Sequence, residues 1–177
     1  MLYVFVVIEH GWRRLAHVNV TPNPTAEWTL QQLREVIGDG EGHRYLIHDR
    51  DSIYARHLDE SIKALGLRVL KTPLQCPQAN AICERVIGTI RRECLDWLIP
   101  LSEKHLRAIL KEWVVHYNAA RVHKRLGPGV PDPPEEPLVI ARGASRHRLA
   151  ADAFVVTKSI LGGLHHEYSL AIAPTSI

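Results

Sequence analysis

Short apolar runs alternate with amphipathic stretches along this chain, and this order predicts an α/β fold. Residues 2–9 are nearly all apolar, which is typical of a strand that is buried on both faces. Residues 14–21 alternate polar and apolar side chains beyond a turn at Gly11, and so predict the hairpin partner of that strand. Ala26–Ile37 repeats apolar residues at helical spacing behind Thr25, a capping residue. The chain therefore begins with a predicted β-hairpin and helix.

The alternation of strands and helices continues toward the middle of the chain. Gly, Pro and capping residues separate the apolar segments, and Ser102 has the position of a helix cap. The expected elements are a strand at Tyr45–His48, a helix at about 55–66, a strand at 67–72, and long helices at about 81–97 and 102–117.

The C-terminal part reads as a separate small unit. Prolines concentrate around residues 131–137 and predict a stiff linker. Ala153–Ile160 and residues 164–172 have strand-like apolar content on either side of Gly162 and Gly163, which predicts a small β-hairpin. We expect a core domain at 1–134, followed by a linker and β-rich extension at 135–177. Whether that extension packs on the core or contacts DNA or another subunit stays open.

Composition narrows the class of protein. A length of 177 residues with 46% hydrophobic residues suits one compact core domain with a small appendage. No apolar run approaches the roughly 20 residues of a membrane span, and the apolar start lacks a basic segment and a cleavage site, which favours a strand over a signal peptide. Three cysteines, an odd number, argue against a disulfide framework. We expect a cytoplasmic protein that does not bind membranes.

Two carboxylates stand where they can share a cation. Asp49 directly follows the strand that ends at His48, and Glu84 lies 35 positions later at the start of a predicted helix. Carboxylates from a strand end and a nearby helix can hold one or two divalent cations, which is the chemistry of phosphodiester transfer. The alternative is structural, because an Asp after a strand commonly caps a turn. His48 is expected to be a packed or hydrogen-bonding neighbour rather than a ligand.

Basic side chains gather in two short segments, although the net charge is only +3. Such groups can bind phosphates through charge and counterion release. The alternative is a solvated helix face and a surface loop, which is the usual role of charge runs. The candidates are Arg85, Arg91 and Arg92 in one segment, and Arg121, His123, Lys124 and Arg125 in the other.

Four motifs occur in an order that resembles one protein family. They are H-D-R-D-S-I-Y at 48–54, N-A-I-C-E-R at 80–85, Arg91 seven positions after Glu84, and Y-N-A-A-R-V-H-K-R-L-G at 117–127 followed by Pro131. Together they resemble the integrase core of bacterial insertion-sequence transposases, in the retroviral-integrase superfamily. The resemblance covers roughly residues 2–134.

The resemblance implies a fold, a reaction and partners. The family has an RNase H-like fold, with a mixed sheet and flanking helices, and an Asp-Asp-Glu triad. Asp49 and Glu84 correspond to its second and third acids, so Mg²⁺ or Mn²⁺ would bind there. The implied activity is cleavage and strand transfer at element ends and target DNA, by a homo-oligomer in the bacterial cytoplasm, associated with the nucleoid when bound to DNA. Arg91, Arg92 and Arg121 would contact phosphates.

The chain also departs from the family pattern. The strand that carries the first acid is absent, as in a truncated gene, a late start codon or a fragment of a split element. Asp51 stands where the family usually has Gly, and a capping or supporting role is favoured for it. We expect impaired catalysis, because two-metal chemistry needs all three acids, and an unpaired edge along residues 2–9. A non-catalytic DNA-binding or oligomerising remnant is the main alternative, and an unrelated metal-dependent nuclease is a third.

Overall fold

The computed structural model describes residues 1–37, 42–49, 56–73, 77–127, 129–133 and 152–172. They fall into two compact units, Met1–Leu110 and Lys111–Ile177, which are described separately. Asp51 and most of the motif that follows Asp49 lie outside the described residues, as does the stretch 135–151 of the expected linker. No described helix is long and apolar enough to span a bilayer.

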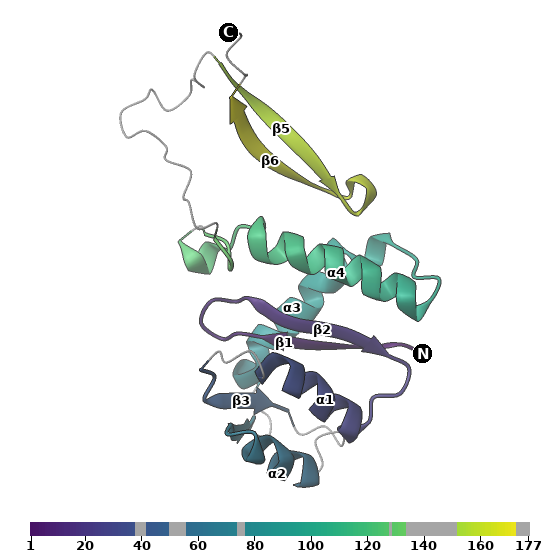
Figure 1. The fold of residues 1–177 in the computed structure, drawn as a ribbon, viewed down its shortest axis with the longest axis vertical. Coiled ribbons are helices and arrows are strands. Elements are labelled where there is room, and N and C mark those ends of the chain that lie inside the picture. Colours follow the sequence, from purple (N-terminus) through teal and green to yellow (C-terminus); the bar gives the residue numbers. More distant parts are fainter. Residues whose placement is uncertain (38–41, 50–55, 74–76, 128, 134–151, 173–177) are drawn as a thin grey trace. The chain divides into compact units, whose positions relative to one another are not determined.

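The elements of the first unit alternate along the chain as expected (Figure 1). They are β1 (Tyr3–Ile8), β2 (Leu15–Thr21), α1 (Ala26–Ile37), β3 (Tyr45–His48), α2 (Arg56–Ala64), β4 (Arg68–Lys71), α3 (Pro77–Glu93), the 3₁₀ helix η1 (Leu95–Trp97) and the first half of α4 (Glu103–Ala119).

The strands of this unit form two small sheets. β1 and β2 are antiparallel, with Tyr3 opposite Thr21. β3 and β4 are parallel, with His48 opposite Lys71, and α2 provides the crossover that a parallel pair requires. Among the described residues, each pair is a sheet of its own. The free edge expected for the first strand is therefore present, since β1 pairs with β2 alone in the part of the chain that the structure describes.

Helices α1 and α2 enclose a small apolar core. Leu33 of α1, Leu58 and Ile62 of α2, and Leu67 before β4 are almost fully buried. Leu58 and Ile62 are four residues apart and so share one face of α2. Partly buried side chains of the strands pack against this cluster, and each buried aliphatic side chain contributes about 1.5–3 kcal/mol. Hydrophobic burial therefore fixes both helices against both sheets.

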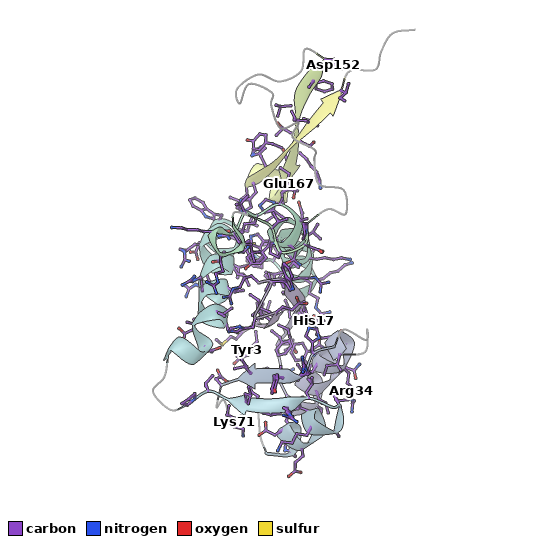
Figure 2. All side chains as sticks on the ribbon, turned by 90° about the vertical axis from the view of Figure 1, so that its left-hand side faces the viewer. Tyr3, His17, Arg34, Lys71, Asp152 and Glu167 are labelled. Atoms are coloured by element: carbon purple, nitrogen blue, oxygen red, sulfur yellow. The ribbon has the colours of Figure 1, made fainter. Side chains whose placement is uncertain are left out.

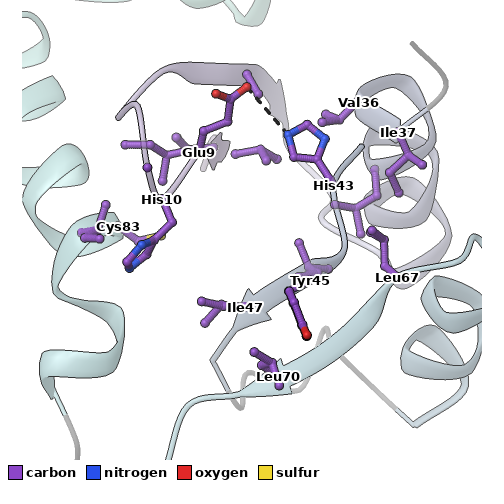
Figure 3. Close-up of a pocket in the computed structure, with 18 of the residues that line it drawn as sticks. Glu9, His10, Val36, Ile37, His43, Tyr45, Ile47, Leu67, Leu70 and Cys83 are labelled. Carbon is purple, nitrogen blue, oxygen red and sulfur yellow. Dashed lines mark ion pairs between the residues drawn. The ribbon is translucent and has the colours of Figure 1, made fainter. Parts of the chain in front are cut away.

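A cavity of about 560 Å³ lies beside this core (Figure 3). Residues of β1, of β3 and of α1 line it, and it is partly open to solvent. It therefore lies between the two sheets of the first unit.

Two helix caps expected from the sequence are confirmed. The Thr25 hydroxyl accepts a hydrogen bond from the Trp28 N–H at 3.2 Å, and the Ser102 hydroxyl accepts one from the His105 N–H at 3.1 Å. Each cap satisfies a backbone donor that the first turn of its helix leaves without a partner.

The expected helix at 81–97 is wrong at both ends. It begins earlier, at Pro77, because the fixed backbone angle of proline suits the first helical position, where no N–H is needed. It ends at Glu93 and is followed by η1, so Leu95 does not extend the α3 face that carries Glu84 and Arg91.

The second unit joins the C-terminal half of α4 to the predicted hairpin. β5 (Ala153–Ile160) and β6 (His165–Ile172) are antiparallel, and the connecting η3 (Leu161–Gly163) uses positive φ angles at Gly162 and Gly163. Positive φ is the reason why glycine is favoured there. The hairpin is confirmed, whereas the predicted domain boundary near residue 134 stays a prediction.

Polar contacts hold the hairpin to α4 inside this unit. Glu167, labelled in Figure 2, accepts a hydrogen bond from His116 at 3.0 Å and pairs with Lys158 at 3.3 Å. Burial alone would raise the pKa of the Glu167 carboxyl, but His116 and Lys158 outweigh burial and lower that pKa. Glu112 accepts a hydrogen bond from the Leu161 N–H at 2.6 Å. The hairpin is therefore packed on a helix.

Candidate metal and nucleic-acid site

Asp49 lies immediately after β3, at the carboxyl end of that strand, and it is exposed. His48, the last residue of the strand, is buried. Its ring Nδ1 is 2.5 Å from the backbone carbonyl oxygen of Asp49. The strand therefore fixes the Asp49 backbone and leaves the residue accessible to solvent, as a ligand of an external cation requires.

Glu84 is exposed on α3, about two turns after its start. Arg91 lies seven residues later on the same helix, and this spacing places both residues on one face. Gly88 lies between them on the helix. The space beside it is taken by the Arg92 guanidinium, because a Cβ at Gly88 would lie 2.9 Å from Arg92 Nη1. Gly88 thus makes room for a side chain of its own helix.

The charges of the two acidic residues both act on the thiol of Cys83. Its thiol is partly buried, and burial is the largest cause that raises its pKa. The carboxylates of Asp49 and Glu84 raise the same pKa further, because nearby negative charge disfavours a thiolate. Each carboxylate is therefore close enough to act on this thiol. Within the described residues, no cluster of three or more His, Cys, Asp or Glu side chains has the arrangement of a metal site, so Asp49 and Glu84 stay predicted ligands.

A buried polar network lies next to Asp49. His48 Nε2 is 3.0 Å from Asp59 Oδ1, and the other Asp59 oxygen forms an ion pair with Lys71. Burial on its own would raise the pKa of the Asp59 carboxyl, but hydrogen bonds and charge from Lys71 and His48 lower it overall. His48 is thus a hydrogen-bonding neighbour, as expected. Sequence analysis missed Asp59, whose only signal was an acid beside Leu58 in an amphipathic helix.

The first basic group lies on α3. Arg85, Arg91 and Arg92 are all exposed. The backbone carbonyl of Arg92 accepts a hydrogen bond from the Trp97 indole N–H at 2.7 Å, which holds η1 against the end of the helix. The three guanidinium groups therefore present positive charge on the same rigid helix that carries the exposed carboxylate of Glu84.

The second basic group, in the unit 111–177, is partly structural. The Arg121 guanidinium lies over the Tyr117 ring at 5.5 Å, and the His123 ring meets the same ring edge-on at 4.8 Å. The His123 N–H also donates a hydrogen bond to the Gly129 carbonyl at 2.7 Å. Lys124 is exposed at the start of η2 (Lys124–Leu126). The motif at 117–127 is thus organised around Tyr117, and Lys124 and Arg125 are exposed charges within it.

A family model and one curated relative resemble this chain. Residues 66–131 match the integrase core domain. The chain is also 32% identical over 101 residues to the Insertion element IS407 uncharacterized 31.7 kDa protein of Burkholderia multivorans (strain ATCC 17616 / 249), a match over 56% of this chain and 32% of that protein. The match thus spans about a third of the length of the relative.

Solved structures show which fold this is. The catalytic core domain of BIV integrase is similar with a TM-score of 0.55 and 18% identity, over 72% of this chain and 81% of that chain. A chain in the structure of the simian T-cell lymphotropic virus intasome in complex with PP2A regulatory subunit B56 gamma gives a TM-score of 0.57 and 12% identity, over 93% of this chain and 59% of that chain. The fold is therefore that of retroviral integrase catalytic cores.

Proposed function

We propose that this chain, whose residues 66–131 match the integrase core domain and whose fold is that of integrase catalytic cores, takes part in DNA transposition or integration. The observation that supports the proposal is that the carboxylates of Asp49 and Glu84 both raise the pKa of the Cys83 thiol, although Asp49 follows β3 and Glu84 lies on α3. Element ends and target DNA are the proposed partners, bound by a homo-oligomer. We place the protein in the bacterial cytoplasm, at the nucleoid when it is bound to DNA.

Asp49 and Glu84 are the proposed ligands of Mg²⁺ or Mn²⁺. Both are exposed carboxylates, and hard divalent cations prefer oxygen donors of this kind. Burial is the largest cause that raises the pKa of the Cys83 thiol, and the two carboxylates raise it further, which supports a cation site near both of them. When bound, the metal would stabilise charge on the attacking and leaving oxygens of a phosphodiester. The residues themselves orient the cation from two separate elements.

The basic side chains are proposed to hold the DNA backbone. Arg85, Arg91 and Arg92 lie on the helix that carries Glu84, so a phosphate beside the cation would lie within reach of that helix. Arg121, His123 and Lys124 form the second proposed contact group. Phosphate contacts of this kind position the nucleic acid and carry no sequence information by themselves.

Catalysis by these 177 residues is proposed to be weak. Two carboxylates supply less charge than the three of the family triad, and losing a ligand costs transition-state stabilisation, so turnover should fall by orders of magnitude. DNA binding depends on the basic residues and should remain. A non-catalytic DNA-binding or oligomerising role is the second candidate, and the exposed arginines of α3 support it because they can bind phosphates without a metal.

The test is a cleavage and strand-transfer assay with Mn²⁺ on candidate element ends. The 177-residue chain, its Glu84→Gln variant and an upstream-extended protein are compared, with Asp96→Asn as a control at an exposed acid of η1. We expect little turnover by the 177-residue chain and more by the extended protein. Robust turnover by the shorter chain that Glu84→Gln abolishes and Asp96→Asn spares would show that two acids suffice.

A further inference from the structure

A short segment between α3 and α4 exposes three large apolar side chains. Trp97, Ile99 and Leu101 are 69%, 82% and 83% exposed. Pro100 lies between the last two and has no N–H with which to join a helix or a sheet. Single apolar residues scattered over a surface need no explanation, whereas contiguous ones commonly mark a binding site. The segment 97–101 is therefore a candidate contact surface.

The Trp97 ring is fixed at its polar edge. Its indole N–H donates a hydrogen bond of 2.7 Å to the backbone carbonyl of Arg92, so this edge is turned toward the end of α3. In the described part of the chain, no other ring stacks on Trp97. A side chain that is ordered in advance loses less entropy when it binds a ligand. Trp97 is thus a preorganised aromatic surface.

The residue that anchors this ring is also a proposed phosphate contact. The Arg92 guanidinium lies beside Gly88, one turn of α3 after Glu84, and Arg91 is exposed on the same helix. Positive charge that follows the backbone, together with an aromatic ring on which a base can stack, is the combination that binds single-stranded nucleic acid. α3 and Trp97 together supply both parts of it.

The charges around Trp97 favour a base over a phosphate as the group that meets the ring. Asp96, the residue before it, is exposed and negatively charged, so it repels phosphate, and Ile99 and Leu101 have no side-chain donor. Every base has a π-face that an aromatic ring can cover. The faces of a paired base are stacked on its neighbours until the base leaves the duplex. The ring therefore fits an unpaired base.

We propose that Trp97 is a stacking platform for an unpaired base of a DNA strand whose phosphates are held by Arg91 and Arg92. Arg92 follows Glu84 by eight residues, which is about 12 Å of α-helix, and a DNA strand advances about 3.4 Å per nucleotide. A strand that follows α3 from Glu84 thus brings roughly its third or fourth base to Trp97. The inference rests on the DNA binding proposed above and adds DNA with unpaired bases as the substrate class.

The first test uses the unchanged protein and two DNA probes. One is a single strand of about 12 thymidines, within the site sizes known for single-strand binding, and the other is an abasic strand of the same length. Both have the same phosphates, and only the first has bases. Fluorescence anisotropy should show at least 5-fold tighter binding of the thymidine strand, the lower end of what one base–aromatic stack contributes. Equal affinities would overturn the proposal.

Matched tryptophan variants locate the contact. Trp97→Leu should weaken binding of the thymidine strand at least 5-fold and leave binding of the abasic strand unchanged, whereas Trp97→Phe keeps a ring and should retain most of the affinity. Trp12→Leu removes a tryptophan of similar exposure, 65%, between β1 and β2, and should change neither affinity. Equal effects of Trp97→Leu on the two probes would contradict a base contact.

Salt dependence separates a direct contact from support of Arg92. If the ring only held Arg92 in place, Trp97→Leu would lessen the dependence of log K on log salt, as the loss of a phosphate contact does. Stacking releases no counterion, so we expect an unchanged slope, and a smaller slope would overturn the proposal. A variant that alters sedimentation of the chain but not its affinity for thymidines would assign the segment to a protein partner instead.

The same titrations distinguish this inference from the proposed function. DNA binding that depends on neither the bases nor Trp97 would overturn the inference and leave the proposed function standing. Failure to bind either probe would count against both.

Discussion

His48 and Asp59 are joined by a hydrogen bond of 3.0 Å between two side chains that are only 3% and 9% exposed. The other Asp59 oxygen pairs with Lys71 of β4, labelled in Figure 2, and the other His48 nitrogen faces the carbonyl of Asp49. This chain of contacts ties α2 and both strands of the parallel sheet to the residue proposed to bind metal. Such contacts orient a ligand from behind.

The first prediction concerns the stability that this network provides. Asp59→Asn should lower the free energy of unfolding at neutral pH by about 1.5–3 kcal/mol, the range for hydrogen bonds to charged groups. The pKa of the Asp59 carboxyl is lowered in the folded state, so its contribution is present above the unfolded value of about 4 and is lost as pH falls through the folded value. Urea unfolding of both proteins between pH 7 and pH 3 measures this.

The pH dependence of the stability difference shows whether the charge of Asp59 is responsible for it. The difference between wild type and Asp59→Asn should shrink as pH falls below about 4, where the unfolded-state carboxyl takes up its proton, and should be smallest below the lowered pKa of the folded state. Asp96→Asn, at an exposed position, serves as the control and should change stability by no more than about 0.5 kcal/mol. A difference that stays constant down to pH 3 would show that the charge of Asp59 has no part in the effect.

Local patterns were enough to predict some of these elements. α1 was predicted at its observed bounds, because a cap and helical periodicity agree there. The start of α3 was missed because Pro77 was read as a loop residue, although proline also suits the first turn of a helix. The network of His48, Asp59 and Lys71 could not be predicted, since it depends on the parallel register that sets His48 opposite Lys71.

The second prediction tests whether the two predicted ligands, Asp49 and Glu84, both lie near the Cys83 thiol. Asp49→Asn and Glu84→Gln should each lower the pKa of the Cys83 thiol, because the carboxylates raise it. Cys83 should then react faster with an alkylating reagent at a fixed pH of about 8, where more thiolate is present. The measurement is the pH dependence of alkylation in a Cys76→Ser background.

Two controls test whether the change in Cys83 reactivity comes from the two predicted ligands. Asp96→Asn should leave the Cys83 profile unchanged, and Mn²⁺ should lower the thiol pKa in the wild type but not in the variants, because a bound cation favours a nearby anion. If only one of the two variants shifts the pH dependence of Cys83 alkylation, Asp49 and Glu84 do not both act on this thiol, and the assignment of the metal site fails.

The third prediction concerns DNA binding by α3. Replacing Arg91 and Arg92 together by Ala should weaken binding to all DNA sequences and should lessen the dependence of log K on log salt by about 1.8, the value for two phosphate contacts. Arg34→Ala, an exposed arginine of α1, is the control and should leave both quantities unchanged. Fluorescence anisotropy titrations between 50 and 200 mM salt measure both. An unchanged salt slope would show that these guanidinium groups are only a solvated helix face.

The fourth prediction concerns the open edge of β1. Because β1 pairs with β2 alone among the described residues, the 177-residue chain should self-associate as its concentration rises, as unpaired apolar edges do. Val6→Lys places a charge on this edge and should shift the equilibrium toward monomer by at least 10-fold. Val115→Lys, an exposed valine of α4, is the matched control. Sedimentation velocity between 5 and 200 μM, with hydrogen exchange along β1, reports the outcome. A wild-type monomer over this range with slow exchange throughout β1 would mean that another segment already fills the edge.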